Sequence, residues 1–220
     1  MALREGGTGI FLGIYDGKIC QKCSSDDEGA KERIDKTGKV VYEKFYYSVY
    51  GKLINISIRS HAEYGDSWIL HLRDEGKDYF LQIPYSSRQA DGFLRRLPNV
   101  KFENNIEIAC GKYNEKAYLV IKQYGEKVEY FWTRENPKGL PPMVEKVVNG
   151  KTVWDDTEKM KYLRNIVMTR IVPKLRELNP IDNVSPVDQV DDYFTPTAPP
   201  PPPPPPKEYT EADVPDDLPF

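Results

Sequence analysis

Apolar and polar residues alternate along much of the first two thirds of the chain, and a period of two predicts β-strands. Asp16-Gly17 separates two such runs and is typical of a two-residue hairpin turn. Gly51 is expected to form a second turn. The expected strands cover residues 9–15, 18–23, 40–50, 52–61, 68–73, 78–83, 106–112, 116–122, 127–133, 144–148 and 152–154.

Two segments have the pattern of helices. Ser86 stands three residues before Gln89, as in a capping box, so a helix is expected to start there and to end by Pro98. A second helix is expected over residues 156–178, with apolar residues recurring on one face. Pro173 is expected to kink or end it.

Residues 24–39 are polar and charged without periodic apolar positions, so a long mobile loop is expected there. Many short strands with one helix midway and one C-terminal helix predict a mainly β fold. An OB-like antiparallel β-barrel with added strands fits this order best, because that fold often carries a helix between its third and fourth strands. A β-sandwich is the alternative.

The composition changes after Pro180 to proline, aspartate and threonine, which predicts a disordered tail. Residues 181–220 hold nine acids and one base, a net charge of −8. Since the whole chain has a net charge of −3, the remaining residues carry +5. Three parts are expected: an OB-like nucleic-acid-binding domain (1–180), a Pro-rich linker (181–207) and an acidic protein-interaction tip (208–220).

Several classes of function find no support in the sequence. No apolar run reaches the roughly 18 residues of a membrane span, and no apolar signal core stands at the start, so a cytoplasmic protein is expected. Cys20 and Cys23 form a lone CxxC pair, which is a frequent false positive for zinc, and Cys110 falls on a core register. His61 and His71 fall on solvent-side registers with arginines. Neither an enzyme nor a metal or other cofactor is therefore expected.

Aromatic and basic residues are interleaved on the expected outward registers. Such a mixture suits single-stranded nucleic acid, because unpaired bases stack on aromatic rings while lysine and arginine follow the phosphates. An ordinary solvated sheet face can carry the same alternation. The candidate binding residues are Tyr42, Lys44, Tyr46, Tyr50, Arg59, Arg73, Lys112, Tyr113, Lys116, Tyr118, Lys122 and Phe131.

The chain ends in Asp216-Asp217-Leu218-Pro219-Phe220. This ending, and the order of body, linker and acidic tip, resembles the single-stranded DNA-binding proteins of bacteria and their phages. The body carries no sequence motif of that family, and the linker is rich in proline where theirs is usually rich in glycine and glutamine. The resemblance implies an OB-fold body that protects single-stranded DNA during replication, recombination and repair, in the host cytoplasm if a phage encodes it.

The same resemblance implies that the tip recruits replication or recombination proteins, with Phe220 in an apolar pocket and Asp216 and Asp217 on its basic rim; Leu218 and Pro219 complete the partner-binding residues. The tip is also expected to compete with DNA for the body. Pro199–Pro206 is expected to be a stiff polyproline II spacer. Alternatively, the chain is an adaptor whose proline tract docks in an SH3-, WW- or profilin-like groove.

Overall fold

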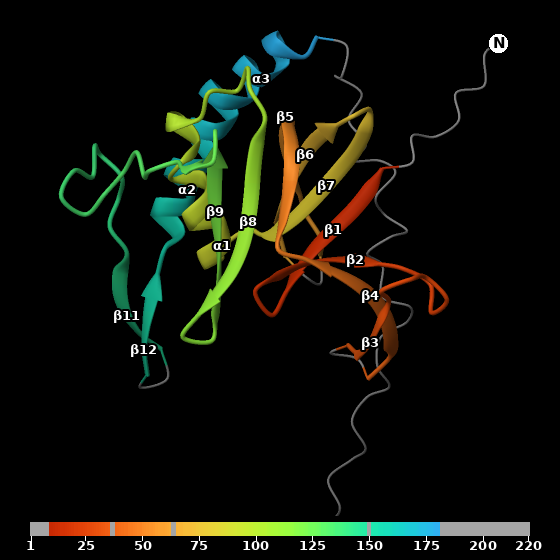
Figure 1. Ribbon diagram of the computed structural model, residues 1–220. Coiled ribbons are helices and arrows are strands. Elements are labelled where there is room, and N and C mark those ends of the chain that lie inside the picture. The colour runs from red at the N-terminus through yellow and green to blue at the C-terminus, as the bar shows by residue number, and fades with distance from the viewer. Residues whose placement is uncertain (1–8, 36–37, 63–64, 149–150, 181–220) are drawn as a thin grey trace, which may run out of the picture.

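A computed structural model describes residues 9–35, 38–62, 65–148 and 151–180 of the protein. Ten strands form one mixed sheet in the order β10-β9-β8-β5-β6-β7-β1-β2-β4-β3, in which only β1 and β7 pair in parallel (Figure 1). These strands are β1 (Ile10–Tyr15), β2 (Lys18–Lys22), β3 (Lys31–Ile34), β4 (Val40–Tyr46), β5 (Ser48–Arg59), β6 (Ser67–Asp74), β7 (Lys77–Pro84), β8 (Ile106–Tyr113), β9 (Lys116–Gln123) and β10 (Glu126–Lys127).

Two further strands, β11 (Val144–Val148) and β12 (Lys151–Asp155), form a separate hairpin. The first helix is α1 (Arg88–Leu94), followed by the 3-10 turn Leu97–Asn99. The C-terminal helix consists of α2 (Thr157–Ile166), the π-helical turn Val167–Ile171 and α3 (Val172–Leu178). The mainly β architecture with one helix midway and one at the C-terminal side is therefore confirmed. The described residues form no closed barrel, since the end strands β10 and β3 do not pair.

The expected hairpin at Asp16-Gly17 is confirmed. Both residues have positive φ, 47° and 72°, as a tight turn between right-twisted strands requires. The prediction of a turn at Gly51 is wrong: β5 continues through it, with φ 156°. A Cβ at this position would lie 2.7 Å from the carbonyl oxygen of Arg73, so glycine is needed for the close approach of β6 and not for a turn.

The expected loop 24–39 contains a strand that the apolar pattern could not predict. β3 pairs antiparallel with β4, and Arg33 reaches from it to the buried carboxylate of Glu43 with two contacts of 2.7 Å. The strand is thus held at the sheet edge by an ion pair and not by alternating apolar residues. In the opposite direction, only Lys127 of the expected strand 127–133 lies in a strand, as the second residue of β10.

The helix boundaries differ from the predicted ones. Ser87, and not Ser86, caps α1 by accepting a hydrogen bond from the backbone of Ala90, and α1 ends before Pro98. Pro173 neither ends nor breaks the C-terminal helix. It stands in the first turn of α3, where the absence of its N–H is tolerated, directly after the π-helical turn.

The core is one continuous cluster of buried side chains from the sheet and the helices. Fully buried Trp68, Leu70 and Leu81 come from β6 and β7. Phe93 of α1 and Leu163 of α2 are buried in the same cluster. Figure 1 shows the helices stacked behind β8 and β9, so the opposite face of these strands is left uncovered by helix.

Some predictions fall outside the described residues. They are the Pro-rich linker and the acidic tip. In the described part of the chain, no helix combines the length and the apolar character needed to cross a bilayer.

Candidate nucleic-acid interface

The bend between β4 and β5 decides which aromatic residues share a face. Residues that pair directly across a ladder point to the same side of the sheet. Tyr46 pairs with the fully buried Ile19, so Tyr46 follows the core side of β4. In β5 the core side carries Val49, and Tyr50 therefore points away from the core. Tyr46 and Tyr50 lie on opposite sides of the sheet, although an uninterrupted alternation would put them together.

The outward side of β5, β8 and β9 gathers five of the predicted binding residues. Three tyrosines, Tyr50, Tyr113 and Tyr118, are 53%, 64% and 36% exposed. Lys116 pairs across the hairpin with Tyr113. Tyr50 of β5 pairs with Glu107 of β8, which on its other side pairs with Lys122 of β9. We call this surface the tyrosine face. It is turned away from the helices, toward the viewer in Figure 1.

A groove of about 440 Å³ opens at one end of the tyrosine face. Tyr50 and Lys122 line it together with Tyr124, whose ring is 70% exposed. Sequence reasoning missed Tyr124 because it stands in the turn after β9, with φ 56°, and not on a strand register. The Nζ of Lys101 lies 5.9 Å from the centre of its ring. The groove therefore places two exposed aromatic rings beside ammonium groups.

Tyr118 lies across Gly111, its partner in the β8–β9 ladder. A Cβ at Gly111 would be 2.6 Å from both the Cζ and the hydroxyl oxygen of Tyr118, so the ring covers the glycine. Because Gly111 has no side chain, the Tyr118 ring packs directly against the backbone of β8. The side of the ring that is turned away from the sheet is left for solvent, or for a stacked base.

We expect Gly111→Ala to displace the Tyr118 ring and thereby to weaken binding of single-stranded DNA about tenfold, since one stacked base contributes roughly 1–3 kcal/mol. The atoms that an added Cβ would meet belong to the flexible Tyr118 side chain and not to the backbone, so the ring has to move. The measurement is fluorescence anisotropy with labelled oligo-dT. In a Tyr118→Ala background the same substitution should have no further effect; an equal loss there would mean that Gly111 acts through something other than the ring.

Basic and acidic side chains both occur on the tyrosine face, since Glu103 and Glu107 line the groove together with Lys122. Within the described residues, Lys116 and neighbouring Lys52 form no ion pair or hydrogen bond with another side chain. Lys122 lies 3.5 Å from Glu107, both partly exposed. Exposed pairs at this distance contribute little, so a phosphate can replace the carboxylate as the partner of Lys122.

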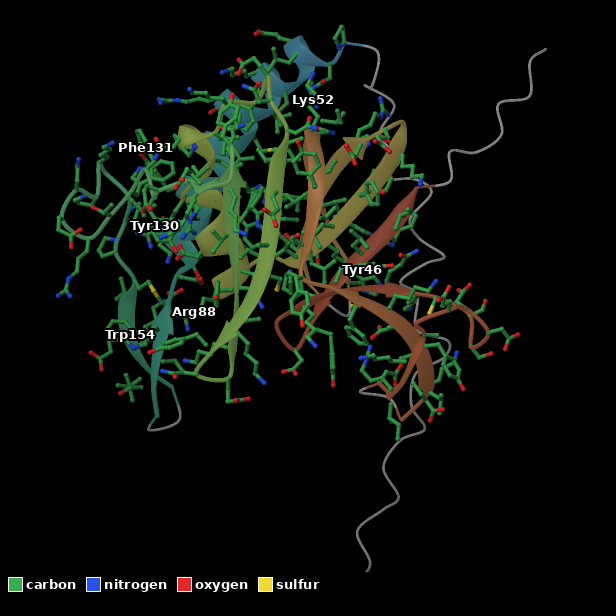
Figure 2. All side chains as sticks on the ribbon, in the orientation of Figure 1. Tyr46, Lys52, Arg88, Tyr130, Phe131 and Trp154 are labelled. Carbon is green, nitrogen blue, oxygen red and sulfur yellow. The ribbon has the colours of Figure 1, made fainter. Side chains whose placement is uncertain are left out.

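Three further candidates, Tyr42, Lys44 and Tyr46, lie together on β4 but not on the tyrosine face. Figure 2 labels Tyr46 at the end of β4 and Lys52 on β5, on separate parts of the sheet. The hydroxyl of Tyr46 donates to Gln21 at 3.1 Å, and that of Tyr42 is 3.4 Å from Glu32. Their rings are thus fixed by contacts among β2, β3 and β4.

Arg59 and Arg73 differ from their expected solvent-side roles. Arg59 is buried at the end of β5. The Nε of Arg73 donates to Asp78 at 2.7 Å, and His71 contacts the same carboxylate oxygen at 2.8 Å. His71 is buried and stacks on a phenylalanine ring, so it is not the surface residue that was expected. Although burial raises the pKa of Asp78, the hydrogen bonds from Arg73 and His71 leave it below its usual value.

The last two candidates are also engaged elsewhere. Lys112 forms ion pairs with Asp16 at 2.5 Å and with Glu115 at 2.7 Å. Hydrogen bonds to these carboxylates raise the pKa of Lys112 above its ordinary range, which keeps the ammonium group charged but occupied. Phe131 follows β10 (Figure 2), where its ring packs edge-on against Trp132 and lies 3.6 Å from the Nζ of Lys138.

The cysteines do not assemble a metal site. Within the described ranges no group of three or more histidine, cysteine or acidic side chains is close enough to hold an ion. Cys20 is buried in β2, where desolvation raises the pKa of its thiol to about 11, and Cys110 is likewise a buried thiol. The expectation that Cys110 belongs to the core is confirmed.

Comparison with known proteins gave no match: no family model fits the chain, and no curated protein or solved structure is significantly similar to it.

Proposed function

We propose that the protein binds single-stranded DNA without strong sequence preference, through the tyrosine face. The observation that carries this proposal is the clustering of exposed rings, Tyr50, Tyr113 and Tyr118, beside Lys116 and Lys122 on one uncovered sheet surface. The three rings stand on the neighbouring strands β5, β8 and β9, and each can accept an unpaired base, whatever its identity. The lysines beside Tyr50 and Tyr113 can meet the phosphates that link the bases.

The strand connections support an OB-like organisation of the body. A single residue separates β4 from β5 in the chain. In the sheet, the strands β6, β7, β1 and β2 lie between them, so the first and last strands of this series are one nearly continuous segment of chain. A long bent strand that contributes to both ends of a curved sheet, with a helix inserted before β8, is typical of OB folds. Many OB folds bind single strands on the outer face of the sheet.

We further propose that the acidic tip recruits proteins of replication and recombination while the body holds DNA. This part depends on the ending Asp216-Asp217-Leu218-Pro219-Phe220, which combines carboxylates with a terminal apolar ring. A binding role, and not catalysis, accounts for both the exposed rings of the body and the charge of the tail.

The salt dependence of oligo-dT binding tests the role of the lysines. Three ammonium groups, those of Lys52, Lys116 and Lys122, give an expected slope of log K against log salt of about −2, at roughly −0.7 for each phosphate neutralised. Replacing Lys52 and Lys116 by glutamine should reduce the magnitude of the slope by about 1.4. Labelled oligo-dT is the suitable probe, because Trp68 and Trp132 are buried and would report poorly on the surface.

Lys112→Gln is the matched control, because its ammonium group is already paired with two carboxylates. Its slope should equal that of the unchanged protein. No binding of oligo-dT at low salt, or a slope that is insensitive to Lys52 and Lys116, would contradict the proposed function.

A further inference from the structure

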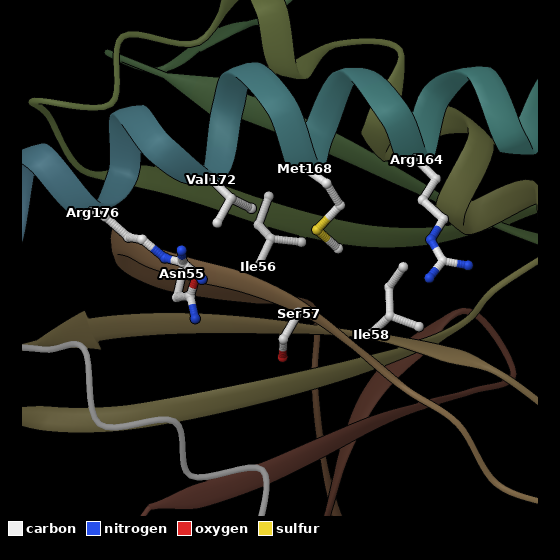
Figure 3. A pocket seen from close by; sticks show the side chains of 8 residues that line it. All are labelled: Asn55, Ile56, Ser57, Ile58, Arg164, Met168, Val172 and Arg176. Atoms are coloured by element: carbon white, nitrogen blue, oxygen red, sulfur yellow. The ribbon is translucent and has the colours of Figure 1, made fainter.

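β5 has a second edge that no strand of the described residues covers beyond Gly51. β8 pairs with β5 only over Ser48–Gly51, whereas β6 pairs with it over its remaining length on the other edge. The C-terminal helix lies alongside this open edge (Figure 3). A groove of about 630 Å³ lies between the C-terminal helix and this edge of β5, and it is separate from the tyrosine face.

The groove combines an apolar middle with charged ends. Ile58 of β5 and Met168 of the helix are partly exposed there, while Ile56 and Val172 are buried and pack beneath them (Figure 3). Met168 belongs to the π-helical turn, a distortion that is often found at functional sites. A flexible methionine in such a wall can adapt to different apolar side chains.

An arginine stands at each end of the groove. Arg164 lies near Ile58, and Arg176 lies near Asn55 (Figure 3). Both arginines are exposed, and neither guanidinium has a hydrogen bond or ion pair in the part of the chain that the structure describes. The side-chain oxygen of Asn55 is buried at the groove wall without a hydrogen-bond partner, which leaves one acceptor unsatisfied.

We propose that this groove binds an extended acidic peptide segment of a partner protein, which adds as a strand to the open edge of β5. The backbone of such a segment would pair with the edge, and its alternate side chains would enter the apolar middle. Carboxylates near the two ends would form bidentate ion pairs with Arg164 and Arg176. The open edge, the apolar middle and the two unpaired arginines are then used together.

The spacing of the arginines sets the length of the segment. They are twelve positions apart on one helical run, a distance of about 18 Å at 1.5 Å per residue. An extended chain covers that distance in about five or six residues, at roughly 3.3 Å each. The groove is therefore suited to a peptide with acidic residues about five positions apart and small apolar residues between them.

A peptide fits this groove better than a nucleic acid does. The groove is lined by no aromatic ring on which a base could stack. An open strand edge, by contrast, offers backbone donors and acceptors that a peptide chain matches at every second residue. This inference does not depend on the proposed function, because the DNA is assigned to the other face.

The test is anisotropy of a fluorescein-labelled eight-residue peptide, Asp-Asp-Val-Thr-Val-Thr-Asp-Asp, with the full chain. We expect saturable binding that the double substitution Arg164→Gln and Arg176→Gln weakens about tenfold or more, since each charge-assisted hydrogen bond is lost. Arg170→Gln is the control on the same helix, because Arg170 does not line the groove, and it should leave binding unchanged. Both variants should bind oligo-dT as the unchanged protein does.

A second probe separates strand addition from simple charge attraction. The same peptide with alternate backbone nitrogens methylated keeps its carboxylates but loses half of its donors, and it should bind at least tenfold more weakly. No binding of the unmodified peptide, or equal binding of both peptides, would overturn the inference. Self-association that the arginine substitutions abolish, or tight displacement of the probe by a peptide of residues 208–220, would assign the groove to this chain and refute a partner protein.

Discussion

Replacing Tyr50 and Tyr118 together by alanine is expected to weaken oligo-dT binding at least about thirtyfold at low salt. Each ring that accepts a base contributes roughly 1–3 kcal/mol, so two rings contribute at least about 2 kcal/mol. Both rings lie on the outward side of the sheet, and Tyr50 also lines the groove next to Tyr124. Anisotropy titrations of the double variant and of each single variant measure the loss.

Tyr47→Ala is the matched control for this loss. Tyr47 is the most exposed of these rings, at 75%, but it stands at the bend between β4 and β5, with its ring beside Lys18. Removing it should change oligo-dT affinity less than twofold. If Tyr47→Ala and the double variant weakened binding equally, the effect of the tyrosines would not be specific to the tyrosine face, and the assignment of the face would be wrong.

The second large effect is expected from Arg33→Ala, which should lower the free energy of unfolding by about 3 kcal/mol. The carboxylate of Glu43 is only 4% exposed and receives two contacts of 2.7 Å from this guanidinium. The hydrogen bonds to Glu43 raise the pKa of Arg33, so its guanidinium keeps its charge. Removing the cation leaves a buried charge without its partner. Urea unfolding followed by circular dichroism measures the change.

Two controls separate the ion pair from the mere loss of a side chain. Ile34→Ala, on the same strand and 66% exposed, removes a side chain away from Glu43 and should change stability by less than about 0.5 kcal/mol. The double substitution Arg33→Ala and Glu43→Leu should recover most of the loss, because it removes both charges and leaves an apolar residue at the buried position. If the double variant were as unstable as Arg33→Ala alone, the unpaired carboxylate would not be the cause.

Features that depend on neighbours in the sequence were predictable. The turn at Asp16-Gly17 follows from the need for positive φ in a tight turn between two strands. The alternation of apolar residues gave the outward registers of β8 and β9 correctly, since Ile106, Ile108 and the residues paired with them share the core side.

Features that depend on distant residues were not predictable. The sequence around Gly51 suggests a glycine in a turn, yet the conformation of Gly51 is set by the close backbone of β6. β3 exists because Arg33 pairs with Glu43, ten residues away. The chain bends at Tyr47, and the alternation of sides does not continue through the bend. Only the cross-strand partners of Tyr46 and Tyr50 reveal that the two residues lie on opposite sides of the sheet. Five of the twelve candidate residues therefore lie on one face, and the other seven are distributed over other surfaces.

Photo-cross-linking of an oligomer that contains iododeoxyuridine, followed by mass spectrometry of the linked peptides, tests the central claim most directly. The account predicts cross-links to Tyr50 and Tyr118, with Tyr113 or Tyr124 as additional sites. Cross-links confined to Tyr42, Tyr46 or Tyr47, or none at all to the outward side of β5, β8 and β9, would contradict it.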